Sequence, residues 1–195
     1  MKKAFSLLCL LLISHGAAAG YSLSVYTGKS FNQSLQTEEG LAIELEDSNH
    51  LAFSIDRTID SARYGFYFSN TKSDFQSSPE LDVEMQYFLF QSAIEVPLGN
   101  RVNGYVGAQI GANYVKPNFA SSDTFFASGL YGGFEYLFND QARVLFETRW
   151  LATIVNNASN VSCTLPTDED KQCLWHFDGD VLNQFQTSLG FTYRF

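Results

Sequence analysis

The chain has 195 residues, with 12 Lys and Arg against 21 Asp and Glu, and a formal net charge of −9 at pH 7. This acidic balance argues against binding to nucleic acid and against electrostatic adsorption to anionic lipid, because both partners are negatively charged. No segment approaches 18 consecutive apolar residues, so the sequence predicts no transmembrane helix. The length predicts one domain after any leader is removed.

Residues 1–19 have the features of a secretory signal peptide. Lys2 and Lys3 form a positively charged start, and the apolar stretch 4–13 that follows is too short to span a bilayer. The three alanines at 17–19 offer a cleavage site before Gly20. We therefore expect an exported protein whose mature domain is 20–195.

Two cysteines remain after the leader, Cys163 and Cys173. In an exported chain this pair most simply predicts a disulfide that closes a short loop. A zinc site is the alternative, but His176 is the only imidazole nearby, which leaves too few ligands. The acidic stretches 167–170 and 178–180 offer oxygen ligands, yet their spacing does not match an EF-hand loop. We predict no metal and no cofactor.

Apolar and polar residues alternate with a period of two along most of the mature chain. This alternation is typical of strands that have two different faces. In the fourth strand the alternation changes phase, which predicts a β-bulge near 86–88. The segment 41–46 also alternates, and we expect it to extend the first hairpin. The eight predicted strands are 21–31, 49–57, 61–70, 81–97, 101–116, 124–138, 141–155 and 180–195.

The predicted connections alternate in length. The short ones are tight turns, and the long ones are polar and rich in Ser, Asn and Asp. Short turns on one side and long loops on the other are typical of outer-membrane barrels. An even number of strands also places both ends of the domain on one side. The turns are 57–60, 97–101 and 139–141, and the longer connections are 32–48, 71–80, 117–123 and 156–179.

Charged residues fall on the less apolar face of the predicted strands. Soluble lipocalin-like and streptavidin-like barrels bury apolar residues inside, whereas a membrane barrel has them outside. An eight-stranded barrel is just wide enough for side chains to fill it, and charges buried there must pair. We therefore expect a plugged lumen, with an open channel as the alternative, lined by Asp56, Arg63, Glu95, Glu135, Arg143, Glu147, Arg149 and Arg194.

The chain ends in the alternating sequence Phe191-Thr192-Tyr193-Arg194-Phe195. With the leader, the eight strands and the alternating loop lengths, this ending resembles the small eight-stranded outer-membrane β-barrels of Gram-negative bacteria. That group includes the OmpA transmembrane domain, OmpX and the opacity-like proteins. The resemblance implies an all-β, antiparallel, up-and-down transmembrane barrel, integral to the outer membrane, with both termini periplasmic. It also implies that Phe191, Tyr193 and Phe195 are the signal read by the barrel-assembly machinery.

The resemblance singles out no one function. We expect a monomer in outer-membrane lipid and lipopolysaccharide, with a structural role or a surface-interaction role through an extracellular ligand of the loop 156–179. The alternatives are a narrow porin-like channel for small solutes and a lipid A-modifying enzyme. An enzyme needs a nucleophile beside a base, and the mature chain has only two histidines, His50 and His176. We assign no catalytic residue. A periplasmic aromatic girdle is predicted from Tyr21, Tyr136, Phe138, Tyr193 and Phe195.

Overall fold

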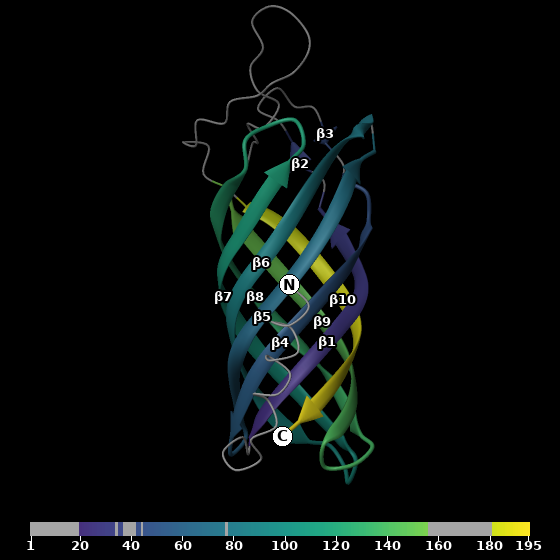
Figure 1. Cartoon of the computed structure of the whole chain (residues 1–195), viewed down its shortest axis with the longest axis vertical. Coiled ribbons are helices and arrows are strands. Elements are labelled where there is room, and N and C mark those ends of the chain that lie inside the picture. Colours follow the sequence, from purple (N-terminus) through teal and green to yellow (C-terminus); the bar gives the residue numbers. More distant parts are fainter. Residues whose placement is uncertain (1–19, 34, 37–41, 44, 77, 156–180) are drawn as a thin grey trace, which may run out of the picture.

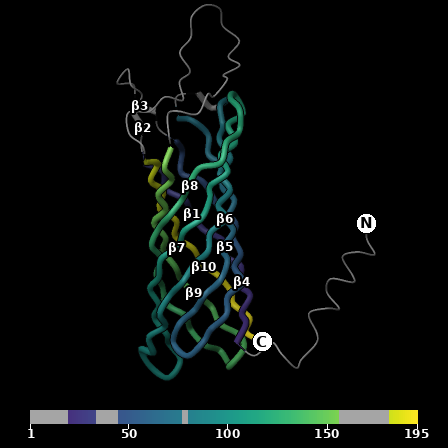
Figure 2. Tube along the Cα trace, turned by 90° about the vertical axis from the view of Figure 1, so that its left-hand side faces the viewer, coloured from purple at the N-terminus to yellow at the C-terminus, as the bar shows by residue number. Residues whose placement is uncertain are grey.

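A computed structural model describes residues 20–33, 35–36, 42–43, 45–76, 78–155 and 181–195. Eight antiparallel strands close into one barrel, as Figures 1 and 2 show. A separate two-stranded sheet pairs β2 (Leu35–Gln36) with β3 (Ala42–Ile43). The barrel strands are β1 (Tyr21–Asn32), β4 (Ser48–Ile59), β5 (Ala62–Phe75), β6 (Ser78–Pro97), β7 (Val102–Pro117), β8 (Asp123–Leu137), β9 (Ala142–Ile154) and β10 (Val181–Arg194).

The barrel is closed between its first and last strands. β1 pairs with β4 on one side and with β10 on the other, in a register that runs from Ser22 opposite Arg194 to Asn32 opposite Gln184. From β4 to β10, each barrel strand pairs with the next barrel strand in the chain. Closure leaves the barrel without an edge strand, so each of its eight strands forms hydrogen bonds on both sides. The predicted all-β, up-and-down barrel is confirmed.

The two ends of the barrel differ in their connections. β4 and β5, β6 and β7, and β8 and β9 are joined by short turns at one end. Gly20 and Phe195 meet at this same end, where the Gly20 backbone N–H donates to the Phe195 backbone O at 3.3 Å. We call it the turn end, and the opposite end the loop end. The paired β2 and β3 lie in the first long connection, where the segment 41–46 was expected to extend the hairpin.

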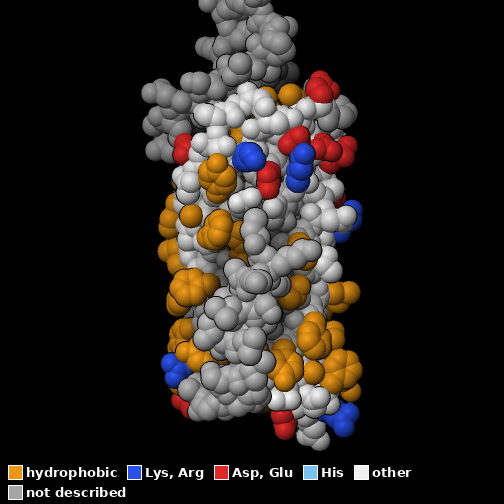
Figure 3. All heavy atoms as spheres, in the orientation of Figure 1, with side chains coloured by type: hydrophobic (Ala, Val, Ile, Leu, Met, Phe, Trp, Pro, Cys, Tyr) orange, Lys and Arg blue, Asp and Glu red, His pale blue; other side chains and the backbone are white. Residues whose placement is uncertain are grey.

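The outer face of the barrel is apolar and the inner face is largely polar. Leu51, Phe66 and Val106 point outward, each more than 60% exposed, whereas Glu147 and Arg149 point inward and are 1% exposed. Figure 3 shows hydrophobic side chains along the sides of the barrel and a group of charged ones near the loop end. An exposed apolar belt of this size is a membrane surface. The lipocalin-like and streptavidin-like alternatives are therefore excluded.

The predicted β-bulge near 86–88 is wrong. β6 keeps one register with β7 from Val83 to Pro97, and the register with β5 shifts only between Asp74 and Phe75. Val83, Met85 and Leu89 are all buried inside the barrel. The phase change arises because the inward residues of β6 are apolar near the loop end and polar further down. The phase change therefore reflects a change from apolar to polar side chains inside the lumen, and the strand continues without a bulge.

The predicted long connection 71–80 is also wrong, since most of it is strand. β5 continues to Phe75 and β6 begins at Ser78. A strand of about 9–11 residues crosses a bilayer, and β6 has 20. Its polar outward residues, such as Asp82 and Glu84, follow the apolar belt toward the loop end. This hairpin therefore extends beyond the membrane, which explains why its sequence is as polar as a loop.

Several predictions concern residues outside the described ranges. The signal peptide at 1–19, the loop 156–179, its cysteines Cys163 and Cys173, and His176 all lie there. Within the described ranges, no helix is long and apolar enough to cross a membrane.

Candidate functional site

The lumen near the turn end contains a cluster of four charged side chains. Arg63 Nη2 lies 2.6 Å from Glu95 Oε1 and also binds Glu135. The other carboxylate oxygen of Glu135 accepts from Arg143 Nη1 at 2.8 Å. The Arg63 guanidinium also lies 4.8 Å from the centre of the Tyr105 ring. Because these residues come from β5 to β9, the cluster ties five strands together across the interior.

Arg149 occupies the middle of the lumen and is fully buried. Its Nε donates to Glu147 Oε1 at 2.5 Å, and its Nη1 donates to the side-chain oxygen of Gln109. Its guanidinium carbon lies 3.6 Å from the centre of the Tyr67 ring and 4.3 Å from that of Tyr131. Aromatic faces attract a guanidinium most strongly when water is excluded. The Arg149 guanidinium thus contacts side chains from four strands at the barrel axis.

Tyr105 joins the two charged groups. Its ring lies against Arg63, and its hydroxyl donates to Glu147 Oε2 at 2.8 Å. The Tyr105 side chain has room to reach both groups because the residue opposite it on β8 is Gly133. A Cβ atom added to Gly133 would lie 2.8 Å from the Tyr105 hydroxyl. The lumen network is therefore continuous from the turn end to its centre.

Replacing Tyr105 with Phe should lower the free energy of unfolding by about 1.5–3 kcal/mol, because it removes a hydrogen bond to a buried carboxylate. Urea unfolding of the barrel in lipid vesicles, followed by tryptophan fluorescence, measures this value. Tyr136→Phe is the matched control, since Tyr136 points outward at the turn end and is 43% exposed. Equal stability of the two variants would contradict a buried network through Tyr105.

Asp56 and Arg194 differ from the other charges predicted for the lumen. Asp56 is buried and accepts from Ser54 Oγ at 2.6 Å and from Gln91 Nε2 at 2.7 Å, without an ion pair to any described residue. Gly65 leaves room for it, because a Cβ there would lie 2.2 Å from Asp56 Oδ1. Arg194 is half-buried at the turn end and likewise has no ion pair within the described part of the chain.

His50 is a buried lumen residue for which the sequence predicted no role. Its Nδ1 lies 3.1 Å from Ser30 Oγ and its Nε2 lies 2.8 Å from Ser188 Oγ. The three residues come from β4, β1 and β10, so only the closure of the barrel brings them together. In the sequence, the only feature that could have indicated this contact was the position of the three residues on the inward face of the period-two pattern.

The loop-end half of the lumen contains a cluster of buried apolar side chains beside buried polar ones such as Ser73, Asn113 and Gln184. This layer follows the polar network toward the external mouth and includes two rings, Phe75 and Phe119, whose centres are 5.5 Å apart. In the sequence, the inward apolar residues Val83 and Met85 indicated this layer. We interpreted the change of phase that they cause as a bulge. The buried layer comprises Leu45, Phe75, Val83, Met85, Val115, Phe119, Phe125, Leu151, Val155 and Leu182.

The predicted rim aromatics point outward at the turn end. Tyr136 and Phe138 have ring centres 5.3 Å apart, and those of Tyr193 and Phe195 are 5.1 Å apart. Tyr21, on the first strand, is 38% exposed at the same end. Aromatic rings at this position are typical of the boundary between lipid tails and headgroups. Phe191 continues the same outward face one step further into the apolar belt.

A closed barrel with an apolar exterior, an aromatic rim and ion pairs inside defines an integral β-barrel membrane protein. The chain belongs to the outer membrane protein beta-barrel domain family, whose model matches residues 5–195. It is therefore an outer-membrane protein, as predicted, and outer-membrane lipid is its environment.

Solved structures with a similar fold include those of two outer-membrane proteins. Neisserial surface protein A has 13% identity and a TM-score of 0.61, with 91% of this chain and 98% of that chain covered. The outer membrane protein OprG from Pseudomonas aeruginosa has 13% identity and a TM-score of 0.54, with 92% and 98% covered. At these identities the similarity shows the fold alone. No curated protein matches the sequence.

Proposed function

We propose that the protein is a monomeric, non-conducting barrel with a structural role in the outer membrane and a surface-interaction role at its external rim. The central position of Arg149 is the observation that carries the proposal. Its guanidinium binds Glu147 and Gln109 and contacts the rings of Tyr67 and Tyr131, so one group of side chains occupies the barrel axis. The interior of an eight-stranded barrel is just wide enough for side chains to fill it, so such a cluster leaves little space for a water path.

The apolar layer above the network supports the same function. Apolar constrictions oppose conduction because they exclude water, so an ion loses hydration water when it enters them. Met85 and Leu151 in this layer are fully buried. An ion would therefore meet a second barrier of different chemistry before it reached the external mouth.

The external rim supports the surface-interaction role. Short turns are periplasmic in this class of protein, so we take the turn end as periplasmic and the loop end as external. Lys72, Glu84 and Lys116 form one outward row across β5, β6 and β7 near the loop end. Lys72 also lies 3.2 Å from Asp82. The two lysine ammonium groups are exposed in this row and are the groups that could bind a phosphate of lipopolysaccharide.

Three further predictions complete the proposal. The disulfide between Cys163 and Cys173 would stiffen the loop 156–179 and lower the entropy cost of binding an extracellular ligand. Phe191, Tyr193 and Phe195 would be read by the barrel-assembly machinery. Residues 1–19 would be removed as a signal peptide.

A narrow channel is the second candidate, and one observation favours it. Some buried polar atoms of the lumen have no hydrogen-bond partner within the described residues, and such atoms can bind water. They include Gln91 Oε1, Gln109 Nε2, Asn113 Oδ1, Tyr131 Oη and Arg149 Nη2. A continuous file of water along these atoms would allow small solutes to pass.

We propose no enzymatic activity. Ser188 and His50 are a hydroxyl and an imidazole 2.8 Å apart, the minimum for an activated nucleophile. Both are buried in the lumen, whereas a lipid A-modifying enzyme needs its nucleophile at the outer leaflet. Within the described residues, no group of His, Cys, Asp and Glu is placed to hold a metal ion.

Single-channel recording tests this function. The refolded barrel should be silent in a planar bilayer, because both lumen layers block the axis. Insertion is checked separately by flotation with lipid vesicles and by the shift in gel mobility on heating that marks a folded barrel. Stable and reproducible current steps from inserted protein would contradict the closed lumen and favour the channel.

A further inference from the structure

Arg57 is a cation on the lipid-facing surface near the periplasmic end of β4. It points outward and is exposed, two residues before Ile59, the last residue of the strand. Its neighbours across the sheet are Tyr21 on β1 and Tyr64 on β5. The guanidinium carbon lies 5.5 Å from the centre of the Tyr21 ring. Arg57 forms no ion pair with any described residue.

This position needs a negatively charged partner. A cation on the lipid face costs free energy that falls toward the interface, so the guanidinium is stable where it meets a headgroup. Guanidinium binds phosphate oxygens through paired N–H groups. Tyrosine rings at the interface lie at the depth of the headgroups. The two tyrosines beside Arg57 therefore place its charge at the level of lipid phosphate.

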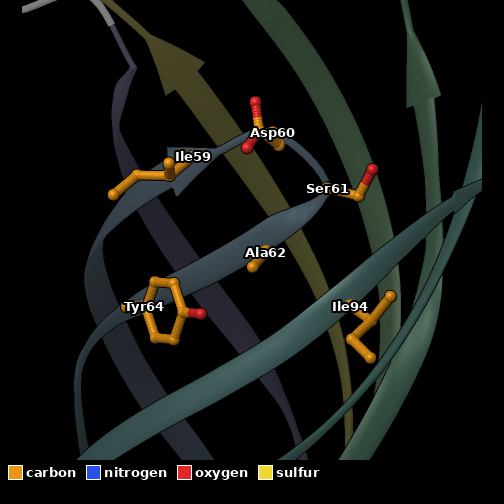
Figure 4. A pocket seen from close by; sticks show the side chains of 6 residues that line it. All are labelled: Ile59, Asp60, Ser61, Ala62, Tyr64 and Ile94. Carbon is orange, nitrogen blue, oxygen red and sulfur yellow. The ribbon is translucent and has the colours of Figure 1, made fainter.

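A groove of about 450 Å³ opens next to this arginine. Its row of Ile59, Ala62 and Ile94 crosses three strands in register, and the small Ala62 lies between the two larger side chains. Figure 4 shows Asp60 and Ser61 at the turn on one side of the groove and the Tyr64 and Ile94 side chains further along the barrel wall. The groove thus joins a polar periplasmic turn to the apolar belt.

Asp60 provides the second charge of this corner. It is an exposed turn residue with φ of 54°, and it forms no ion pair with any described residue. An unpaired cation and an unpaired carboxylate three residues apart complement a headgroup that carries both a phosphate and an ammonium. A purely anionic headgroup would satisfy Arg57 but would be repelled by Asp60.

We propose that this corner of the barrel binds one phospholipid of the periplasmic leaflet that has an ethanolamine headgroup. Arg57 binds the phosphodiester, Asp60 binds the primary ammonium, and an acyl chain lies in the groove over Ala62. The site does not depend on the state of the lumen, so it stands whether the barrel conducts or is closed.

Native mass spectrometry of the full barrel in detergent tests the site. The probes are phosphatidylethanolamine and phosphatidylglycerol with identical chains, and lipid A. The wild-type protein should bind its first molecule of phosphatidylethanolamine more tightly than its first molecule of phosphatidylglycerol or of lipid A. Arg57→Gln should lower the affinity for phosphatidylethanolamine about tenfold, as expected for loss of a charge-assisted contact. Asp60→Asn should remove the preference over phosphatidylglycerol, and Asn tolerates the left-handed φ of this turn.

Arg101→Gln is the matched control, because Arg101 is an exposed arginine in the β6–β7 turn at the same end. This variant should bind phosphatidylethanolamine like the wild type. Ala62→Trp should fill the groove and weaken both phospholipids, and the heat-induced gel shift shows that each variant is folded. Equal losses in Arg57→Gln and Arg101→Gln, an unchanged preference in Asp60→Asn, or tighter binding of lipid A would overturn the proposal.

Discussion

Replacing Arg149 with Met should lower the free energy of unfolding by about 3–5 kcal/mol, because it removes one partner of a buried ion pair. Glu147 would keep its charge in the lumen with only the Tyr105 hydroxyl as a donor at 2.8 Å. The side-chain oxygen of Gln109 would lose the Arg149 donor, and the rings of Tyr67 and Tyr131 would lose the cation between them. Equilibrium unfolding in urea, with the barrel in lipid vesicles, measures the loss.

Two further variants make this result specific. Arg101→Met changes the charge equally at an exposed turn and should alter stability by less than about 1 kcal/mol. Combining Arg149→Met with Glu147→Gln should recover part of the loss, since the second change removes the unpaired carboxylate. A loss below about 1 kcal/mol for Arg149→Met would show that the lumen charges do not hold the barrel together.

Replacing Ile110 with Arg should destabilise the barrel by about 2–4 kcal/mol, the cost of a cation on the lipid face near the bilayer midplane. Ile110 is 52% exposed, and its cross-strand neighbours Phe90 and Ser128 are also on the outer face. It lies near the middle of β7. The same unfolding measurement in vesicles of unsaturated phosphatidylcholine gives the value.

Tyr114→Arg provides the matched control for this variant. Tyr114 lies on the same strand and the same face, four residues closer to the loop end, where β7 approaches Lys116 and the polar rim. A cation near the interface costs about 0–1 kcal/mol. Equal effects of the two variants would mean that β7 crosses no lipid between these positions.

The sequence was sufficient to predict the fold because period-two alternation reports each strand and its two faces directly. Trp150 and Arg149 are neighbours in the chain, yet one is on the outer face and the other is buried. Charged residues on one face and apolar ones on the other indicated a membrane barrel before any contact was known. The strand limits were less predictable, because the β5–β6 hairpin beyond the membrane is polar on its outer face like a loop.

The alternation of residues along the strand also gave a wrong prediction where the side chains inside the lumen change from polar to apolar. Val83 and Met85 are apolar and inward, while Phe88 is apolar and outward, so hydrophobicity alone suggested a bulge. Both sides of a strand are apolar when one contacts lipid and the other a buried layer. Only the pairing of β6 with β5 and β7 shows which residues are inside.

By itself, the sequence determined the eight strands, the inverted faces and the charged character of the lumen, because these depend on residues near one another in the chain. The tertiary structure decided the partners. Arg63 binds Glu135, 72 positions away, and His50 meets Ser188, 138 positions away. Register and closure fix such contacts, and both depend on the whole ring of strands. The unpaired charges beside the groove at the β4–β5 turn likewise became a candidate site only once the strands were joined.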